Sequence, residues 1–98
     1  MVYCFDLDGT LCSITEPSSY QKAEPNWDRI GKVNSLYDKG NIIIIDTARG
    51  SETGIDWYEI TQNQLSSWGV KYHRLRVGRK IAADFYIDDK GIKDSDFF

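Results

Sequence analysis

The sequence predicts an α/β fold with a parallel sheet of about four strands flanked by helices. Apolar, β-branched runs alternate with segments whose apolar residues recur at helical spacing, which is the pattern of right-handed βαβ units. The four isoleucines at residues 42–45 are typical of a central parallel strand that helices cover on both faces. A chain of 98 residues has room for one domain, and we expect that domain to span residues 1–98.

Each element has its own local signal. Strands are expected at residues 2–6, 42–45, 71–77 and 83–88. Asn26 can cap a first helix, which Gly40 stops. Asp56 begins a capping-box pattern, and the apolar stripe after it predicts a second helix that ends at Gly69. Residues 12–25 contain two prolines and are expected to form an extended loop over the edge of the sheet where the first strand ends.

Composition narrows the class of protein. At 41% hydrophobic and 28% charged residues the chain is typical of a globular protein, and no apolar run approaches the roughly 20 residues of a membrane helix. Met1 leads directly into the first strand without a basic leader, so we expect no signal peptide and a cytoplasmic protein. Cys4 and Cys12 lack the partners of a disulfide framework or a zinc site and are expected to be reduced.

The most informative stretch is the turn that follows the first strand, Asp6-Leu7-Asp8-Gly9-Thr10. Alternate residues of a strand share a face, so Asp6 and Asp8 can both point into a pocket at the carboxyl edge of the sheet. One carboxylate can then attack phosphorus while the other moves a proton, and a divalent cation can screen their charge. The stretch therefore predicts phosphoryl chemistry.

This Asp-x-Asp-Gly-Thr pattern resembles the first motif of the haloacid dehalogenase superfamily, and candidates for its other motifs follow in the right order. Thr47 ends the isoleucine strand, as the second motif requires. Arg79-Lys80 supplies a basic residue before the last expected strand, and Asp88-Asp89 supplies an acidic pair after it. The resemblance extends from residue 2 to about residue 92 and implies a minimal Rossmann-like fold with phosphatase activity.

The resemblance also implies a role for each motif residue. Asp6 would be the nucleophile that forms an aspartyl-phosphate, and Asp8 would act as general acid and then as general base. Thr47 would hydrogen-bond the phosphoryl oxygens. Lys80 would neutralise the nucleophile and the phosphate, with Arg79 as the alternative cation.

The implied cofactor is Mg²⁺, which prefers octahedral oxygen ligands and keeps several waters. Its ligands would be the Asp6 carboxylate, the backbone carbonyl of Asp8, and one member of the Asp88-Asp89 pair. Asp88 is the first choice for the direct ligand, and the reverse order is the alternative, because adjacent residues of a strand point in different directions.

The intervals between the motifs are too short for a cap domain, so the site should be open. Residues 47–89 resemble small, capless members linked to capsule, lipopolysaccharide or sugar biosynthesis and to phages. They imply a phosphorylated sugar or a similar small metabolite as substrate, with a homo-oligomer as one way to close the site. Thr10, Arg49 and Gly50 are the expected substrate contacts; the Arg49 guanidinium could hold an anionic group or pair with Glu52 instead.

Two other functions are compatible with parts of the sequence. An open site would also suit a polynucleotide end phosphatase, but a net charge of −3 is unfavourable for binding nucleic acid. A local basic patch keeps that alternative open, formed by Lys71, Arg74, Arg76, Arg79 and Lys80. A non-catalytic binding module is the other alternative, against which the intact set of motif residues weighs.

Overall fold

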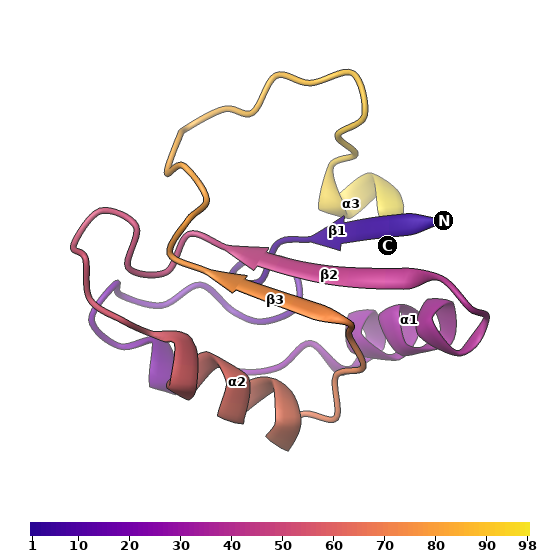
Figure 1. Ribbon diagram of the computed structural model, residues 1–98, viewed down its shortest axis with the longest axis horizontal. Coiled ribbons are helices and arrows are strands. Elements are labelled where there is room, and N and C mark those ends of the chain that lie inside the picture. Colours follow the sequence, from indigo (N-terminus) through magenta and orange to yellow (C-terminus); the bar gives the residue numbers. More distant parts are fainter.

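The computed structural model describes residues 1–98 and contains a three-stranded parallel sheet with helices beside it (Figure 1). The elements in chain order are β1 (Val2–Phe5), η1 (Tyr20–Lys22), α1 (Trp27–Asp38), β2 (Ile42–Thr47), α2 (Tyr58–Ser67), β3 (Arg74–Val77) and α3 (Asp94–Phe97). The strand order is β1-β2-β3, so the isoleucine strand is central, as expected. The α/β class is confirmed, with three strands in place of about four. None of the helices has the length and apolar character needed to cross a bilayer.

The first two helices form where the sequence predicts them. The Asn26 side chain accepts the backbone N–H of Arg29 at 3.2 Å and caps α1, and Gly40 ends that region with a φ of 93°. At α2 the predicted capping box does not form: Trp57 is the N-cap and its side chain makes no cap hydrogen bond, while Asp56 accepts the backbone N–H of Tyr58 at 2.9 Å. The cap at Asn26 and the stop at Gly40 depend on residues close together in the chain, which is why residue type and spacing predict them.

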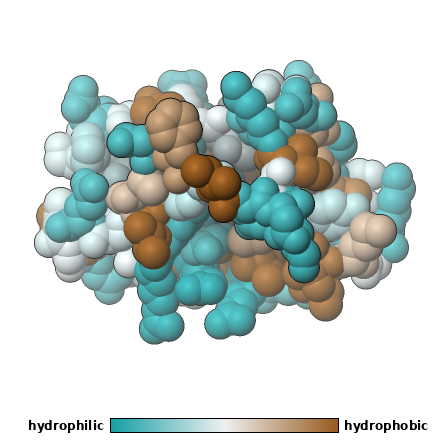
Figure 2. All heavy atoms as spheres, turned by 90° about the horizontal axis from the view of Figure 1, so that it is seen from above, coloured by the Kyte–Doolittle hydropathy of each residue, from teal (hydrophilic) through white to brown (hydrophobic).

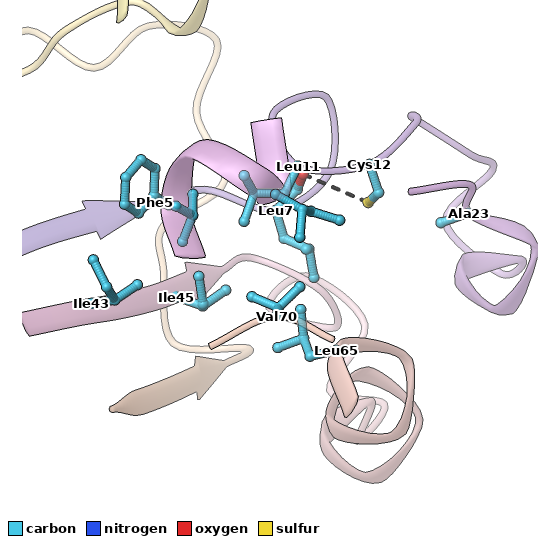
Figure 3. Close-up of a cluster of buried hydrophobic side chains, with 11 residues drawn as sticks. Phe5, Leu7, Leu11, Cys12, Ala23, Ile43, Ile45, Leu65 and Val70 are labelled. Carbon is cyan, nitrogen blue, oxygen red and sulfur yellow. Dashed lines mark hydrogen bonds between the residues drawn. The ribbon is translucent and has the colours of Figure 1, made fainter. Parts of the chain in front are cut away.

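The hydrophobic core lies on one face of the sheet. Phe5, Ile43 and Ile45 share that face and belong to one cluster with Ile30 of α1 and Leu65 of α2. Figure 3 shows the strand residues of this cluster facing Leu65. Both helices lie on one side because two right-handed crossovers that step in the same direction along a sheet place their helices on the same face. Burial along β2 consequently alternates, with the side chains at 43, 45 and 47 buried.

The opposite face, which we call the open face, has no covering helix. Val2 and Ile42 are 63% and 46% exposed on it, and Cys4, two residues further along β1, is exposed as well. The prediction that helices cover the isoleucine strand on both faces was therefore wrong. A continuous apolar run usually marks a strand buried on both faces, but here Ile42 and Ile44 are apolar on a face that no helix covers.

The expected fourth strand at residues 83–88 does not form. Residues 78–93, which we call the arch, leave the end of β3 as a long loop and return to α3 beside β1 (Figure 1). Every residue from 81 to 93 is exposed. The segment has the composition of a strand but no neighbouring strand to pair with in this chain, and a strand needs that pairing.

The short helix α3, which the sequence analysis did not predict, holds the end of the arch against the body. Phe97 and Phe98 pack on Phe5 with ring centroids 5.6 and 5.9 Å away. Asp94 accepts a hydrogen bond of 2.7 Å from Arg29 of α1. The Arg29 side chain holds the pKa of the Asp94 carboxyl below its usual value.

Candidate functional site

A pocket of about 250 Å³ opens at the carboxyl edge of the sheet, where β1 and β2 end. Its walls come from the turn after β1, the loop after β2, the loop before α1 and the arch: Asp6, Asp8, Pro17, Tyr20, Thr47, Ala48, Arg49, Gly50, Ser51, Glu52, Thr53 and Ala82. Parallel strands end at one edge of a sheet, so residues that follow separate strands in the sequence meet there.

Asp6 and Lys80 form an ion pair at the mouth of this pocket. The Lys80 Nζ lies 3.4 Å from the Asp6 Oδ1, and the Asp6 side chain is 42% exposed. Solvent and a ligand can therefore reach the carboxylate. Arg79, the alternative cation, is exposed and makes no ion pair.

Arg49 holds the second carboxylate of the motif. Its Nε donates to Asp8 Oδ2 at 2.9 Å, and its Nη2 donates to Asp8 Oδ1 at 2.8 Å. Its Nη1 donates to Thr61 at 3.1 Å and to Gln64 at 2.6 Å, both on α2. The guanidinium also lies 4.8 Å from the centroid of the Tyr20 ring. We call this set of contacts the Arg49 clamp.

The clamp differs from the sequence expectation for Arg49. The partner is Asp8 and not Glu52, and the guanidinium is turned onto the protein, since the residue is only 1% exposed. A guanidinium has five N–H donors, and here all three nitrogens are paired. The arrangement fixes the orientation of the Asp8 carboxyl group, and no guanidinium nitrogen is left without a partner for a substrate anion.

Cys12 lies beside the clamp, and its thiol is unreactive. Its Sγ is 3.5 Å from Asp8 Oδ1 and 3.6 Å from the backbone oxygen of Leu7. Burial, together with the nearby Asp8 charge, raises the pKa of the Cys12 thiol to about 12. The thiol therefore stays protonated near neutral pH and does not act as a nucleophile.

The end of β2 and its loop form the opposite wall. Thr47 is 1% exposed, and its Oγ1 accepts the backbone N–H of Arg49 at 3.3 Å, which leaves the hydroxyl proton for another acceptor. Gly50 has a φ of 81°, and a Cβ there would lie 2.1 Å from the backbone oxygen of Ile55, so its need for glycine is conformational. Ser51 lines this pocket, and its buried Oγ has no hydrogen-bond partner.

Thr10 does not line this pocket. Its backbone oxygen accepts a hydrogen bond of 3.2 Å from Arg29, and the residue borders a separate hollow of about 690 Å³ with Arg29 and Asp94. The expectation of a direct substrate contact at Thr10 thus finds no support in the position of the residue.

Asp88 and Asp89 lie on the arch, exposed, and line a different hollow from Asp6 and Asp8. The backbone N–H of Lys90 donates to Asp88 at 2.9 Å and lowers the pKa of that carboxyl. The structure places no three His, Cys, Asp or Glu side chains together as a metal-binding group. Within one chain the expected oxygen donors for Mg²⁺ are therefore incomplete: Asp6 and Asp8 line the pocket, but Asp88 and Asp89 do not.

Thr61, Gln64 and Tyr20 are site residues that the sequence analysis missed. Thr61 and Gln64 are three apart on α2, so they lie on one face of the helix, and their polar side chains interrupt its apolar stripe. That interruption was the only signal for them. Gln64 also donates to the backbone oxygen of Tyr20 at 2.7 Å, which ties the loop before α1 to the pocket.

Comparison with known proteins adds one relative. No family model matches the sequence, and no curated protein matches it. The crystal structure of a structural-genomics target from Vibrio cholerae is similar, with a TM-score of 0.86 and 30% sequence identity. The match covers 98% of this chain and 85% of that one.

Proposed function

This chain belongs to the same family as the Vibrio cholerae protein, and we propose that it is a capless phosphatase of the haloacid dehalogenase type. It would hydrolyse phosphomonoesters through an aspartyl-phosphate. The observation that carries the proposal is the convergence of Asp6, Asp8, Thr47 and Lys80 at one end of the sheet. An accessible carboxylate beside a lysine and a second, rigidly held carboxylate are the groups that nucleophilic phosphoryl transfer needs.

In the first step an Asp6 carboxylate oxygen bonds to the substrate phosphorus. The bond from phosphorus to the alcohol oxygen breaks, and Asp8 gives its proton to that oxygen. To act as an acid, Asp8 must carry a proton on one carboxyl oxygen, so that oxygen must be released from Arg49, which donates to both of them in this structure. Lys80 offsets negative charge at Asp6 and on the phosphoryl group, and the Thr47 hydroxyl can donate to a phosphoryl oxygen.

In the second step a water oxygen bonds to phosphorus while Asp8 takes a proton from that water. The bond from phosphorus to Asp6 breaks, so phosphate leaves and both carboxyl groups return to their starting states. The Arg49 clamp supports this role of Asp8, because a base that is held in one orientation loses less entropy in the transition state.

The proposed cofactor is Mg²⁺, which would screen the charge that Asp6 shares with the phosphate. The donors within one chain are incomplete, so none of the steps above is drawn through the metal.

A small substrate fits this site best. The pocket of about 250 Å³ lies just below the roughly 300–1,000 Å³ usual for small-molecule sites, which favours a small ligand such as a sugar phosphate over a polymer. The basic residues Arg74 and Arg76 lie on β3, outside the walls of the pocket, which gives no particular support to an oligonucleotide substrate.

The test is phosphate release with and without Mg²⁺ across sugar phosphates, nucleotides and 3′-phosphorylated oligonucleotides. Asp6→Asn should lower kcat by about 10³-fold or more, because it removes the nucleophile and keeps the shape. Asp38→Asn is the matched control, since that carboxylate pairs with Lys71 at the surface, and its activity should match the wild type. Borohydride reduction of the quenched enzyme should convert Asp6 to homoserine, detectable by mass spectrometry. A folded wild-type protein without Mg²⁺-dependent activity would favour the binding-module alternative.

A further inference from the structure

The arch presents a concentration of exposed apolar side chains. Ile81, Phe85, Tyr86, Ile87 and Ile92 are 77%, 83%, 57%, 98% and 65% exposed. Figure 2, which views the molecule from the side of the arch, shows apolar atoms on the surface there among hydrophilic ones. Apolar patches of this kind mark surfaces that bind another molecule.

The arch is held at both ends, so these side chains are not on a free tail. Lys80 is anchored on Asp6 at one end, and Asp94 is anchored on Arg29 at the other. Inside the arch, the Tyr86 hydroxyl donates to the backbone oxygen of Ile81, and the Lys80 Nζ lies 4.8 Å from the Tyr86 ring centroid. The contacts hold the arch in a defined shape while residues 81–93 remain exposed.

A surface suited to the arch lies on the same molecule. β1 is an edge strand, so one side of its backbone is unpaired, and such an edge can accept a further strand. Val2 and Cys4 are exposed beside that edge on the open face. The exposed apolar side chains of the arch and those beside this edge can therefore cover one another.

The end of β1 and the middle of the arch also match in sequence pattern. Tyr3-Cys4-Phe5 precedes Asp6, and Phe85-Tyr86-Ile87 precedes Asp88. If the arch segment adds parallel to β1 with these runs side by side, Asp88 reaches the carboxyl edge of the sheet next to Asp6. The carboxylate that is absent from the pocket of a single chain would then be present.

We propose that two copies of this chain exchange arches, so that residues 83–88 of each copy add to the free edge of β1 of the other. Asp88 and Asp89 of one copy then complete the metal-binding carboxylates at Asp6 of its partner. The exchange is a two-fold, self-complementary contact, which closes as a dimer. The inference rests on the proposed function for its metal but not for its dimer.

Complementation between inactive variants tests the shared site. Asp6→Asn removes the nucleophile, and the double variant Asp88→Asn, Asp89→Asn removes the acidic pair, so each should be inactive alone. Unfolded together and refolded at equal amounts, they should recover about a quarter of wild-type activity, because half of the dimers are mixed and each mixed dimer has one intact site. If each arch serves its own chain, no recovery follows, and the proposal is overturned.

Cross-linking tests the exchange without any activity. The proposed register places Tyr86 beside Cys4 of the partner, so Tyr86→Cys should form a disulfide-linked dimer under copper phenanthroline, whereas the matched variant Ile87→Cys points to the other face and should not. Light scattering of the wild type should give twice the mass of the chain. A monomeric wild type, or a Tyr86→Cys disulfide within one chain, would overturn the proposal even if the phosphatase activity is found. An inactive wild type that still cross-links as a dimer would reject the proposed function and leave the exchange standing.

Discussion

Replacing Arg49 with methionine should destabilise the protein by about 3 kcal/mol, which is a large share of the stability of a domain this small. Methionine keeps much of the side-chain volume but removes every hydrogen bond of the clamp. Breaking a buried ion pair costs about 3–5 kcal/mol. The lower end applies here, because the Asp8 side chain is 20% exposed and water can replace part of what it loses.

Urea unfolding followed by circular dichroism measures this loss of free energy of unfolding directly. In thermal unfolding, at about 4–8 °C per kcal/mol, the melting temperature should fall by roughly 12–24 °C. Lys71→Met is the matched control, since it removes a pair of similar length, 2.8 Å, whose side chains are 48% and 58% exposed. A surface pair of this kind contributes about 0–1 kcal/mol.

A double-mutant cycle with Asp8→Asn separates the Asp8 contact from the contacts on α2. We expect a coupling energy of about 2 kcal/mol between Arg49 and Asp8, because they share two charge-assisted hydrogen bonds. A loss for Arg49→Met no greater than that for Lys71→Met would refute the clamp as a stabilising network. A coupling near zero would show that Arg49 acts through Thr61 and Gln64 and does not hold Asp8.

Three further predictions follow from single contacts. Gly50→Ala should lower the free energy of unfolding, measured by urea denaturation, by about 2 kcal/mol or more, because it adds a Cβ at positive φ against a backbone carbonyl. An unchanged urea midpoint would contradict the observed loop. Asp94 has a lowered pKa through Arg29, so its pair stabilises α3 fully above the usual Asp pKa of about 3.9 and is lost as the pH falls through the lower, folded value. Amide exchange of α3 should rise over that acid range, and Asp94→Asn should show fast exchange at every pH; a wild type without this pH dependence would show that the Arg29–Asp94 pair does not hold α3. Iodoacetamide at pH 8 should modify exposed Cys4 before buried Cys12, whose pKa is about 12, and mass spectrometry showing the reverse order would contradict the burial.

Much of the fold and part of the site follow from interactions that are local in the chain. The cap at Asn26, the stop at Gly40 and the central isoleucine strand could all be predicted, because each depends on residue type and short spacing. The placement of Asp6 and Asp8 in one pocket could be predicted in the same way, because alternate residues along the direction of a strand point to the same side.

Contacts between distant segments were decided only by the tertiary structure. Sequence neighbours suggested Glu52 as a partner for Arg49, but the chain path brings Asp8 and two residues of α2 around the guanidinium instead. The apolar run at residues 85–87 has the composition of a strand, but no strand forms there. A strand needs the unpaired edge of another strand beside it, and composition does not indicate where in the fold that edge lies. The sequence alone thus predicted a set of candidate site residues, and the tertiary structure decided which of them meet, because contacts between distant segments are set by topology and packing.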